Sequence, residues 1–243
     1  MKRMPHSARR SCGFTLVEAA IVLVLVGLLI GGLAIPLSAR LEQRQYEQTR
    51  QTLADIREAL LGFAAARGYL PCPAKSASDA EEDRAPGGAC NRQSGLLPWR
   101  TLGTADADDW GRQFHYRVSA AFSDAANRPT LFTHADLHVR ARDGAGAAQE
   151  LASPDGLPPV VVLSHGPNGH WATGKNGVAQ AEGPATSVDE RQNANPGSDD
   201  RIVYARPPSR NDDAARGGAF DDEVLWISPY VLLARLIQGG RLP

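Results

Sequence analysis

Glu18 is a carboxylate inside an otherwise apolar run, where an ionised side chain needs a specific function. The run covers residues 14–37, and it is preceded by basic residues and by no acidic residue. A carboxylate in the hydrocarbon region of a membrane costs on the order of 2–3 kcal/mol at mid-depth, and less near the interface. Glu18 is therefore a candidate functional residue, and we expect it to need a positively charged partner.

Residues 14–37 are long enough to cross a bilayer as a helix, because a span needs about 20 apolar residues. A secretory signal has a shorter apolar core, about 7–15 residues, and ends at a small-residue cleavage site. The nearest such site follows Ala39. A cut there would need a small residue at position 37, where the chain has Leu37. The basic flank is retained on the cytoplasmic side of a membrane. This pattern predicts a single-pass protein with an exported C-terminal part.

The stretch GFTLVE, residues 13–18, resembles the type IV prepilin signature that type IV pilins and type II secretion pseudopilins share. The resemblance implies that a prepilin peptidase cuts between Gly13 and Phe14, and that the new Phe14 amine is methylated. It also implies that Glu18 of one subunit neutralises the Phe14 amine of a neighbour in the assembled filament. Charge pairing in a low dielectric then helps to set the subunit register.

The resemblance also implies a domain order and a location. Residues 1–13 are the cleaved leader, 14–37 the transmembrane and filament-core helix, 38–68 its amphipathic continuation, and 69–243 a periplasmic or extracellular globular domain. The precursor is expected in the inner membrane with its leader in the cytoplasm, and later in a pilus or pseudopilus. Its expected partners are the prepilin peptidase, other pilin or pseudopilin subunits, the inner-membrane assembly platform, and membrane lipid before assembly. The chain length and the long loops favour a minor or atypical subunit.

The pattern beyond Pro36 predicts that the helix continues. Apolar residues recur at three- and four-residue steps through residues 38–68, with charged residues between them. Gly68 and Pro71 end this pattern. Pro36 itself removes one backbone hydrogen bond, which predicts a kink. A coiled-coil stalk over residues 40–67 is the alternative.

Short strand-like runs separated by turn residues predict the rest of the fold. These runs cover residues 113–119, 130–140, 159–165, 201–206 and 223–228. Residues 180–200 are polar without a period and are predicted as a long surface loop, and residues 229–237 as a short closing helix. The predicted fold class is α+β. A long kinked N-terminal helix, with a membrane half and an amphipathic half, packs on a small antiparallel sheet with long loops, as in pilins.

The cysteines of the exported part predict a disulfide. Cys12 lies in the leader and leaves with it, so Cys72 and Cys90 remain as an even pair in an exported domain. They bracket a polar loop. Two free buried thiols are the alternative. A zinc site is less favoured, because no close pair of cysteines or histidines supports it.

Two segments resemble the glycine turn and the acidic loop of major pseudopilins, where such a loop holds calcium. They are LSHGPNG at residues 163–169 and FDDEVLWIS at residues 220–228. Calcium binds about six to eight oxygen ligands, which clustered carboxylates and loop carbonyls supply. The alternative is that these are solvated loop acids. The candidate ligands are Asn168, Asp199, Asp200, Asp221 and Asp222.

The predicted function is a structural subunit of a type IV pilus or a type II secretion pseudopilus. The sequence shows no nucleophile elbow and no phosphate-binding loop, and we do not expect an enzyme. A net charge of −1 gives no electrostatic case for nucleic acid. The alternatives are a membrane-anchored periplasmic enzyme or binding protein with an uncleaved span, and a secreted protein cut near Ala39. Calcium is the one candidate cofactor.

Overall fold

The computed structural model describes residues 15–194 and 200–242, apart from the side chains of residues 29–39. The predicted leader and the cleavage junction between Gly13 and Phe14 lie outside the described residues. The predictions that depend on that junction stay predictions.

Internal contacts divide the chain into two units, Met1–Arg44 and Gln45–Pro243, and helix α1, Leu16–Arg67, contributes to both. In the first unit the described side chains of residues 15–28 are all exposed. Among the described residues, no helix combines the length and the apolarity that a membrane span requires. The predicted span 14–37 falls partly on residues outside the description, and it stays a prediction.

Pro36 lies within the helical range of α1, and its side chain is outside the described residues. The backbone is assigned as helix on both sides of this position. A proline inside a helix removes one hydrogen bond of the helical ladder. The kink at Pro36 therefore stays a prediction, which rests on this lost hydrogen bond.

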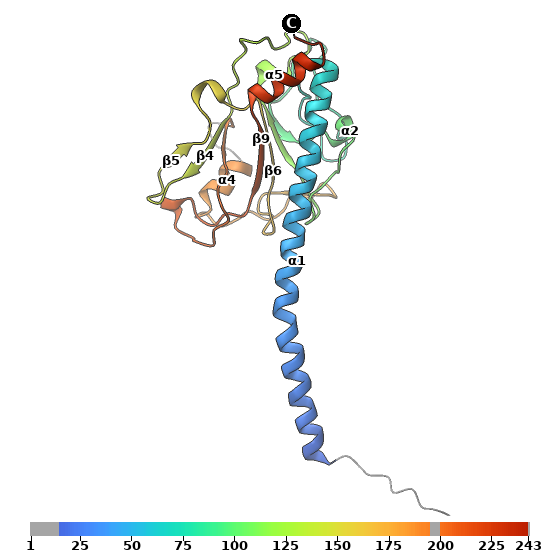
Figure 1. Cartoon of the computed structure of the whole chain (residues 1–243), viewed down its shortest axis with the longest axis vertical. Coiled ribbons are helices and arrows are strands. Elements are labelled where there is room, and N and C mark those ends of the chain that lie inside the picture. Colours follow the sequence, from blue (N-terminus) through green and yellow to red (C-terminus); the bar gives the residue numbers. More distant parts are fainter. Residues whose placement is uncertain (1–14, 195–199, 243) are drawn as a thin grey trace, which may run out of the picture. The chain divides into compact units, whose positions relative to one another are not determined.

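The second half of α1 packs on a sheet through one face. Leu53, Ile56, Leu60 and Ala64 recur at three- and four-residue steps and are buried in the main core. The opposite face of this half is polar and exposed. Near the C-terminal end, helix α5, Pro229–Gln238, contributes to the same core. The globular unit therefore has a helical layer that covers one face of the sheet (Figure 1).

The main sheet has four antiparallel strands in the order β1-β3-β6-β9. They are β1 Ser94–Leu96, β3 His115–Val118, β6 Val160–Ser164 and β9 Glu223–Ile227. β6 is buried along its whole length, as expected of an apolar strand that is covered on both faces. Val160 and Val162 contribute to the core that contains α1, whereas Val161 and Leu163 contribute to a second core.

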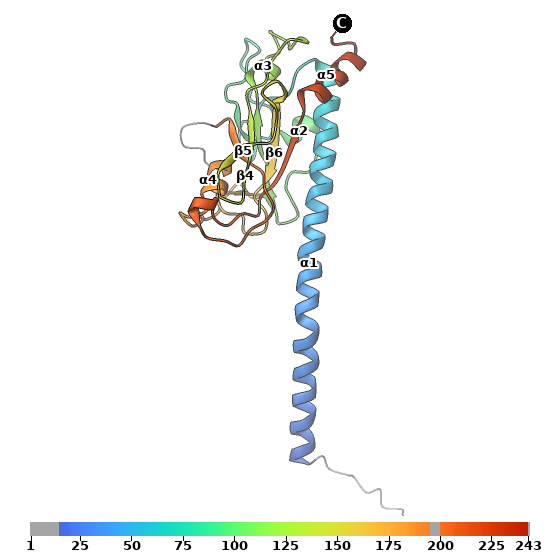
Figure 2. The same ribbon diagram turned by 60° about the vertical axis from the view of Figure 1, so that its left-hand side comes forward.

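A second sheet of three strands covers the other face of β6. Its order is β5-β4-β8, with β4 antiparallel to β5 and parallel to β8. The strands are β4 His138–Arg142, β5 Ala148–Glu150 and β8 Ile202–Tyr204. Val139 of β4 and Val203 of β8 join Val161 and Leu163 in the second core. The globular unit thus has three layers, one helical and two of sheet (Figure 2).

Short elements connect these layers. A two-stranded ribbon pairs β2 with β7. The helical turns lie between the strands. The bounds of these elements are β2 Arg112–Gln113, β7 Thr173–Gly174, α2 Trp99–Leu102, α3 Ala120–Ser123, η1 Pro154–Gly156, α4 Val188–Ala194 and η2 Ala214–Arg216.

The α+β class and the antiparallel main sheet are confirmed, and two local predictions are wrong. The strand predicted over 130–140 begins only at His138, because Thr130 and Thr133 close a turn through their side chains and main chain. The loop predicted over 180–200 contains α4. The first turn of α4 carries two acidic residues, which interact favourably with the start of a helix.

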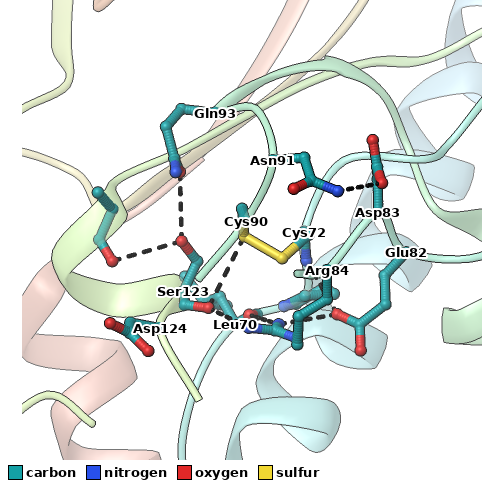
Figure 3. The surroundings of a disulfide bond; sticks show 12 residues. Leu70, Cys72, Glu82, Asp83, Arg84, Cys90, Asn91, Gln93, Ser123 and Asp124 are labelled. Carbon is teal, nitrogen blue, oxygen red and sulfur yellow. Dashed lines mark hydrogen bonds and ion pairs between the residues drawn. A yellow bond between two sulfur atoms is a disulfide. The ribbon is translucent and has the colours of Figure 1, made fainter. Parts of the chain in front are cut away.

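Cys72 and Cys90 form a disulfide, with their Cα atoms 5.3 Å apart. Arg84 lies inside the loop that this bond closes, and it donates to the main-chain oxygens of Leu70 and Ser123. Figure 3 shows the arginine beside the disulfide, near Leu70 and Ser123. The loop is therefore tied covalently at its ends and by hydrogen bonds from within.

Replacing Cys72 and Cys90 together by alanine should lower the free energy of unfolding by about 3 kcal/mol. The reason is that a cross-link with a sequence separation of 18 restricts the unfolded chain. Urea unfolding of the full chain in detergent, followed by circular dichroism, measures the loss. Cys12→Ala is the matched control, because Cys12 takes no part in the cross-link. An unchanged stability of the double variant would contradict the prediction.

Candidate functional site

The first candidate site is the start of α1, where Thr15 and Glu18 bind each other. Thr15 Oγ1 and N–H donate to Glu18 Oε2 at 3.3 and 3.4 Å, and Glu18 N–H donates to Thr15 Oγ1 at 3.2 Å. This reciprocal pattern is a capping box, which satisfies amide groups at the start of a helix. Both side chains are exposed, so the carboxylate remains accessible to a further partner. The Thr-x-x-Glu spacing is the sequence signal for this pair, and Thr15 was not predicted.

The second candidate site is a group of three carboxylates, Glu190, Asp221 and Asp222, which we name the carboxylate cluster. Each residue offers an oxygen atom, and these atoms lie within 4.8 Å of one another. Glu190 comes from α4, whereas the two aspartates directly precede β9. Glu190 is 1% exposed and Asp222 is 5% exposed. Three negative charges at this separation repel one another, so the cluster needs protons or a cation.

The pKa values of the cluster show the cost of holding these charges together. Burial raises the pKa of Glu190 to about 8, and the charges of Asp222 and Asp221 add to the rise. Burial also raises the pKa of Asp221 to about 6, against the hydrogen bond from the Asn168 N–H. Glu190 therefore holds a proton at neutral pH unless a positive charge binds beside it.

Hydrogen bonds hold one oxygen of each carboxylate in the cluster. Glu190 Oε1 accepts from Asn168 Nδ2 at 3.0 Å and from the Asp221 N–H at 2.9 Å. Asp221 Oδ2 accepts from the Asn168 N–H at 3.0 Å. Asp222 Oδ2 accepts from Asn193 Nδ2 at 2.8 Å. These bonds fix the direction of the three carboxylates.

The second oxygens of Glu190 and Asp221 are buried and have no hydrogen-bond partner. Buried polar atoms without a partner are rare in folded proteins, and each costs about 1–3 kcal/mol. The two atoms, Glu190 Oε2 and Asp221 Oδ1, belong to the same cluster. The remaining oxygen of Asp222, Oδ1, lies 3.7 Å from His165 Nδ1. The cluster therefore presents open oxygen atoms at a buried position.

The residue before Glu190 shows how the same helix compensates a different buried carboxylate. Asp189 is fully buried, and it forms ion pairs with Arg142 at 2.6 Å and with Arg206 at 2.8 Å. Among the described residues, no lysine or arginine forms an ion pair with Glu190. Asp189 is thus neutralised by two ion pairs, whereas Glu190, when it is ionised, has no lysine or arginine partner among the described residues.

The loop that carries Asn168 approaches Asp221 closely because of a glycine. Gly166 has φ 57°, and a Cβ atom there would collide with the main-chain oxygen of Asp221. A glycine adopts this left-handed conformation without strain. Arg112 holds the same loop by donating to the main-chain oxygens of Gly166 and Pro167, the second at 3.0 Å. The close approach places the Asn168 donors against two carboxylates.

The structure places the predicted ligands in different positions. Asp221 and Asp222 belong to the carboxylate cluster, and Asn168 binds it as a hydrogen-bond donor. Asp200 is not in the cluster and lines a separate cavity of about 300 Å³. Asp199 lies outside the described residues.

Glu190 is the cluster residue that the sequence reasoning missed. Its segment was predicted as loop because it is polar and has no apolar period. The acidic pair Asp189 and Glu190 after Ser187 is a helix-start signal that could have placed α4. No local signal indicates that this helix meets Asp221, which lies 31 residues further along the chain.

The comparison with protein families concerns the first candidate site. Residues 8–34 match the family model described as the prokaryotic N-terminal methylation motif. The chain carries the type IV pilin and pseudopilin signature. This match confirms the resemblance of the GFTLVE stretch, and the prepilin signature implies processing by a prepilin peptidase and assembly with other pilin subunits. Searches of curated proteins and of solved structures found no match.

The raised pKa of Glu190 predicts a pH dependence of stability. The folded chain keeps a proton on Glu190 up to about pH 8, whereas the unfolded chain releases it near the ordinary value of 4.5. Between these values the folded state binds more protons, so the free energy of unfolding falls as the pH rises, by up to about 1.4 kcal/mol per pH unit. Urea unfolding in a chelator across this range measures the slope.

Glu190→Gln should flatten this slope, because it removes the titrating group and keeps its size. Glu182→Gln is the matched control, since it removes an exposed carboxylate from the same half of the chain. The difference between the two variants isolates the buried group. An equally steep slope in Glu190→Gln would show that Glu190 does not cause it.

Proposed function

We propose that this chain is a structural subunit of a type IV pilus or of a type II secretion pseudopilus. The observation that supports the proposal is the N-terminal methylation motif at residues 8–34, with Glu18 in the first turn of α1. In this proposal a prepilin peptidase removes residues 1–13 and the amine of Phe14 is methylated. The apolar part of α1 then passes from the bilayer into the core of the filament.

In the proposed assembly Glu18 exchanges partners. In the isolated chain its carboxylate accepts hydrogen bonds from the Thr15 hydroxyl and N–H. Cleavage after Gly13 creates a new positive charge on Phe14, the residue before Thr15. In a filament, the amine of a neighbouring subunit supplies the counter-charge in a medium from which water is excluded, where an ion pair is stronger than in water. The capping box thus satisfies the carboxylate before assembly, and the neighbour's amine satisfies it afterwards.

The first test is the mature N-terminus together with Glu18→Ala. Mass spectrometry of membrane-extracted protein from the native cell should show a chain that begins at N-methylated Phe14. Glu18→Ala should leave insertion in the membrane unchanged but reduce the fraction of the chain in sheared filaments at least about tenfold, the effect of losing about 1.4 kcal/mol of pairing per contact.

Thr15→Ala is the matched control for Glu18→Ala, because it removes the capping box and keeps the carboxylate. An intact Met1 in cells with an active peptidase would contradict the processing. It would favour the alternative, a membrane-anchored periplasmic enzyme or binding protein with an uncleaved span. Normal filament incorporation of Glu18→Ala would contradict the charge-pair role alone.

We also propose that the carboxylate cluster binds a hard divalent cation, calcium being the candidate. The chemistry of the site fits this ion, since all the candidate ligands are oxygen atoms and calcium prefers carboxylate and carbonyl oxygens. The supporting observation is the pair of buried oxygens without a partner, Glu190 Oε2 and Asp221 Oδ1. Glu190, Asp221 and Asp222 would hold the ion, which would supply the cationic partner that Glu190 lacks among the described residues.

Calcium should raise the melting temperature of the chain in detergent after treatment with a chelator. A ligand at 100 times its dissociation constant stabilises the folded state by about 2.7 kcal/mol. Glu190→Gln and Asp221→Asn should each abolish the rise. Asp212→Asn, which removes an exposed carboxylate, is the matched control and should keep it. A rise of the same size in all three variants would indicate binding elsewhere, and no rise in the unmodified chain would contradict the cation site.

A further inference from the structure

Arg117 is a buried cation that donates hydrogen bonds to four main-chain oxygens. It lies on β3 and is 1% exposed. Its Nη1 donates to the carbonyls of Asp200 and Ile202 at 2.8 and 2.7 Å. Its Nη2 donates to the carbonyls of Gln192 and Asn193 at 2.9 and 2.5 Å. The side chain therefore connects the main sheet to the last turn of α4 and to the start of β8.

The chemistry of these contacts suits a guanidinium. The last carbonyls of a helix have no partner within the helix, and they carry the negative end of its dipole. A planar guanidinium has five donors in a fixed arrangement, so it can serve several carbonyls at once, whereas an ammonium is a compact point charge with three donors. A buried charge is costly unless it is hydrogen-bonded, and the four bonds from Nη1 and Nη2 to main-chain oxygens offset that cost for Arg117.

The segment that Arg117 holds is the one that carries the α4 side of the carboxylate cluster. Asn193, whose carbonyl accepts from Arg117, donates through its side chain to Asp222 Oδ2 at 2.8 Å. Glu190 lies three residues earlier on the same helix, and residues at this spacing share a face. Asn193 Oδ1 also accepts from the Tyr204 N–H at 2.7 Å, which fixes the direction of its amide.

Two separate anchors therefore fix α4. At its start, Asp189 pairs with Arg142 and Arg206. At its end, Arg117 binds the carbonyls of the last turn. The first anchor acts on the side chain of Asp189 through ion pairs, whereas the second acts on the backbone of Asn193, a residue that contacts the cluster.

We propose that Arg117 is the positioning residue of the carboxylate cluster. From the main sheet it fixes the end of α4, and it thereby holds Glu190 and Asn193 against Asp221 and Asp222. For cation binding this inference rests on the proposed cation site. The positioning itself does not, because it determines the geometry of the cluster in the metal-free chain as well.

The test compares Arg117→Lys with Tyr116→Phe in the full chain in detergent. Lysine keeps the charge and loses the planar arrangement of donors. Tyr116 directly precedes Arg117 on the same strand and is also buried. Changing it to phenylalanine removes its hydrogen bond to the Pro71 carbonyl. The control therefore perturbs β3 without contact to α4.

The first measurement is amide hydrogen exchange in the presence of a chelator. The Tyr204 N–H binds Asn193 Oδ1, and the Asp221 N–H binds Glu190 Oε1, so both amides report the position of α4. Arg117→Lys should accelerate their exchange about tenfold or more relative to Tyr116→Phe. Unchanged protection of both amides in Arg117→Lys, or equal acceleration in the control, would overturn the positioning role.

The second measurement is calcium affinity by calorimetry. Arg117→Lys should weaken binding about 10- to 100-fold, as is typical when a residue that orients metal ligands is changed, and Tyr116→Phe should not. Equal affinity of Arg117→Lys and the unmodified chain would overturn the role in cation binding. If the unmodified chain binds no calcium, the proposed cation site fails, and the exchange of the two amides still decides the positioning role.

If Arg117→Lys does not fold, native-state exchange of the unmodified chain in low urea replaces it. The inference requires the last turn of α4 and the Asp221 amide to open together in one step below global unfolding. Opening of the Asp221 amide while the end of α4 stays protected would overturn the inference.

Discussion

The burial of β6 on both faces is the constraint on which the globular unit depends. A strand with the sequence VVVLS has no polar face to present to water, so it needs apolar cover on each side. The second half of α1 supplies the cover on one side, and the three-stranded sheet supplies it on the other. The three-stranded sheet and its connections bring α4 and β8 next to the main sheet, and the carboxylate cluster depends on that placement.

The three-stranded sheet and α4 are joined to the main sheet by buried charged residues as well as by apolar contacts. The charges of these residues are compensated to different degrees. Asp189 is neutralised by two arginines. Arg117 donates to carbonyls at the end of α4 and near the start of β8. Glu190 has hydrogen bonds to one oxygen and, among the described residues, no lysine or arginine partner. Since a single helix contains both a neutralised and an open carboxylate, the open one is a specific feature of the site and not a general property of the region.

The N-terminal unit differs from the globular unit, because its carboxylate, Glu18, is exposed in the isolated chain. The side chains of residues 15–28 that surround Glu18 are exposed, and the capping box is the local arrangement that satisfies its charge. An apolar helical surface with one carboxylate at its start is incomplete as a single chain. The methylation motif at residues 8–34 is the type IV pilin signature, which implies assembly with other pilin subunits.

The sequence by itself determined the features that depend on local order. The prepilin signature, the long helix with an apolar face, the Cys72–Cys90 pairing and the apolar run of β6 could all be predicted from spacing and residue type. The start of β4 was placed too early because the side chains of Thr130 and Thr133 close a turn, although threonine also favours strands. Tertiary structure alone decided that Glu190 meets Asp221 and Asp222, and that Arg117 fixes α4. These contacts join segments about 30 to 80 residues apart, and which polar residues meet is set by how the two sheets pack around β6, a long-range arrangement that no local pattern encodes.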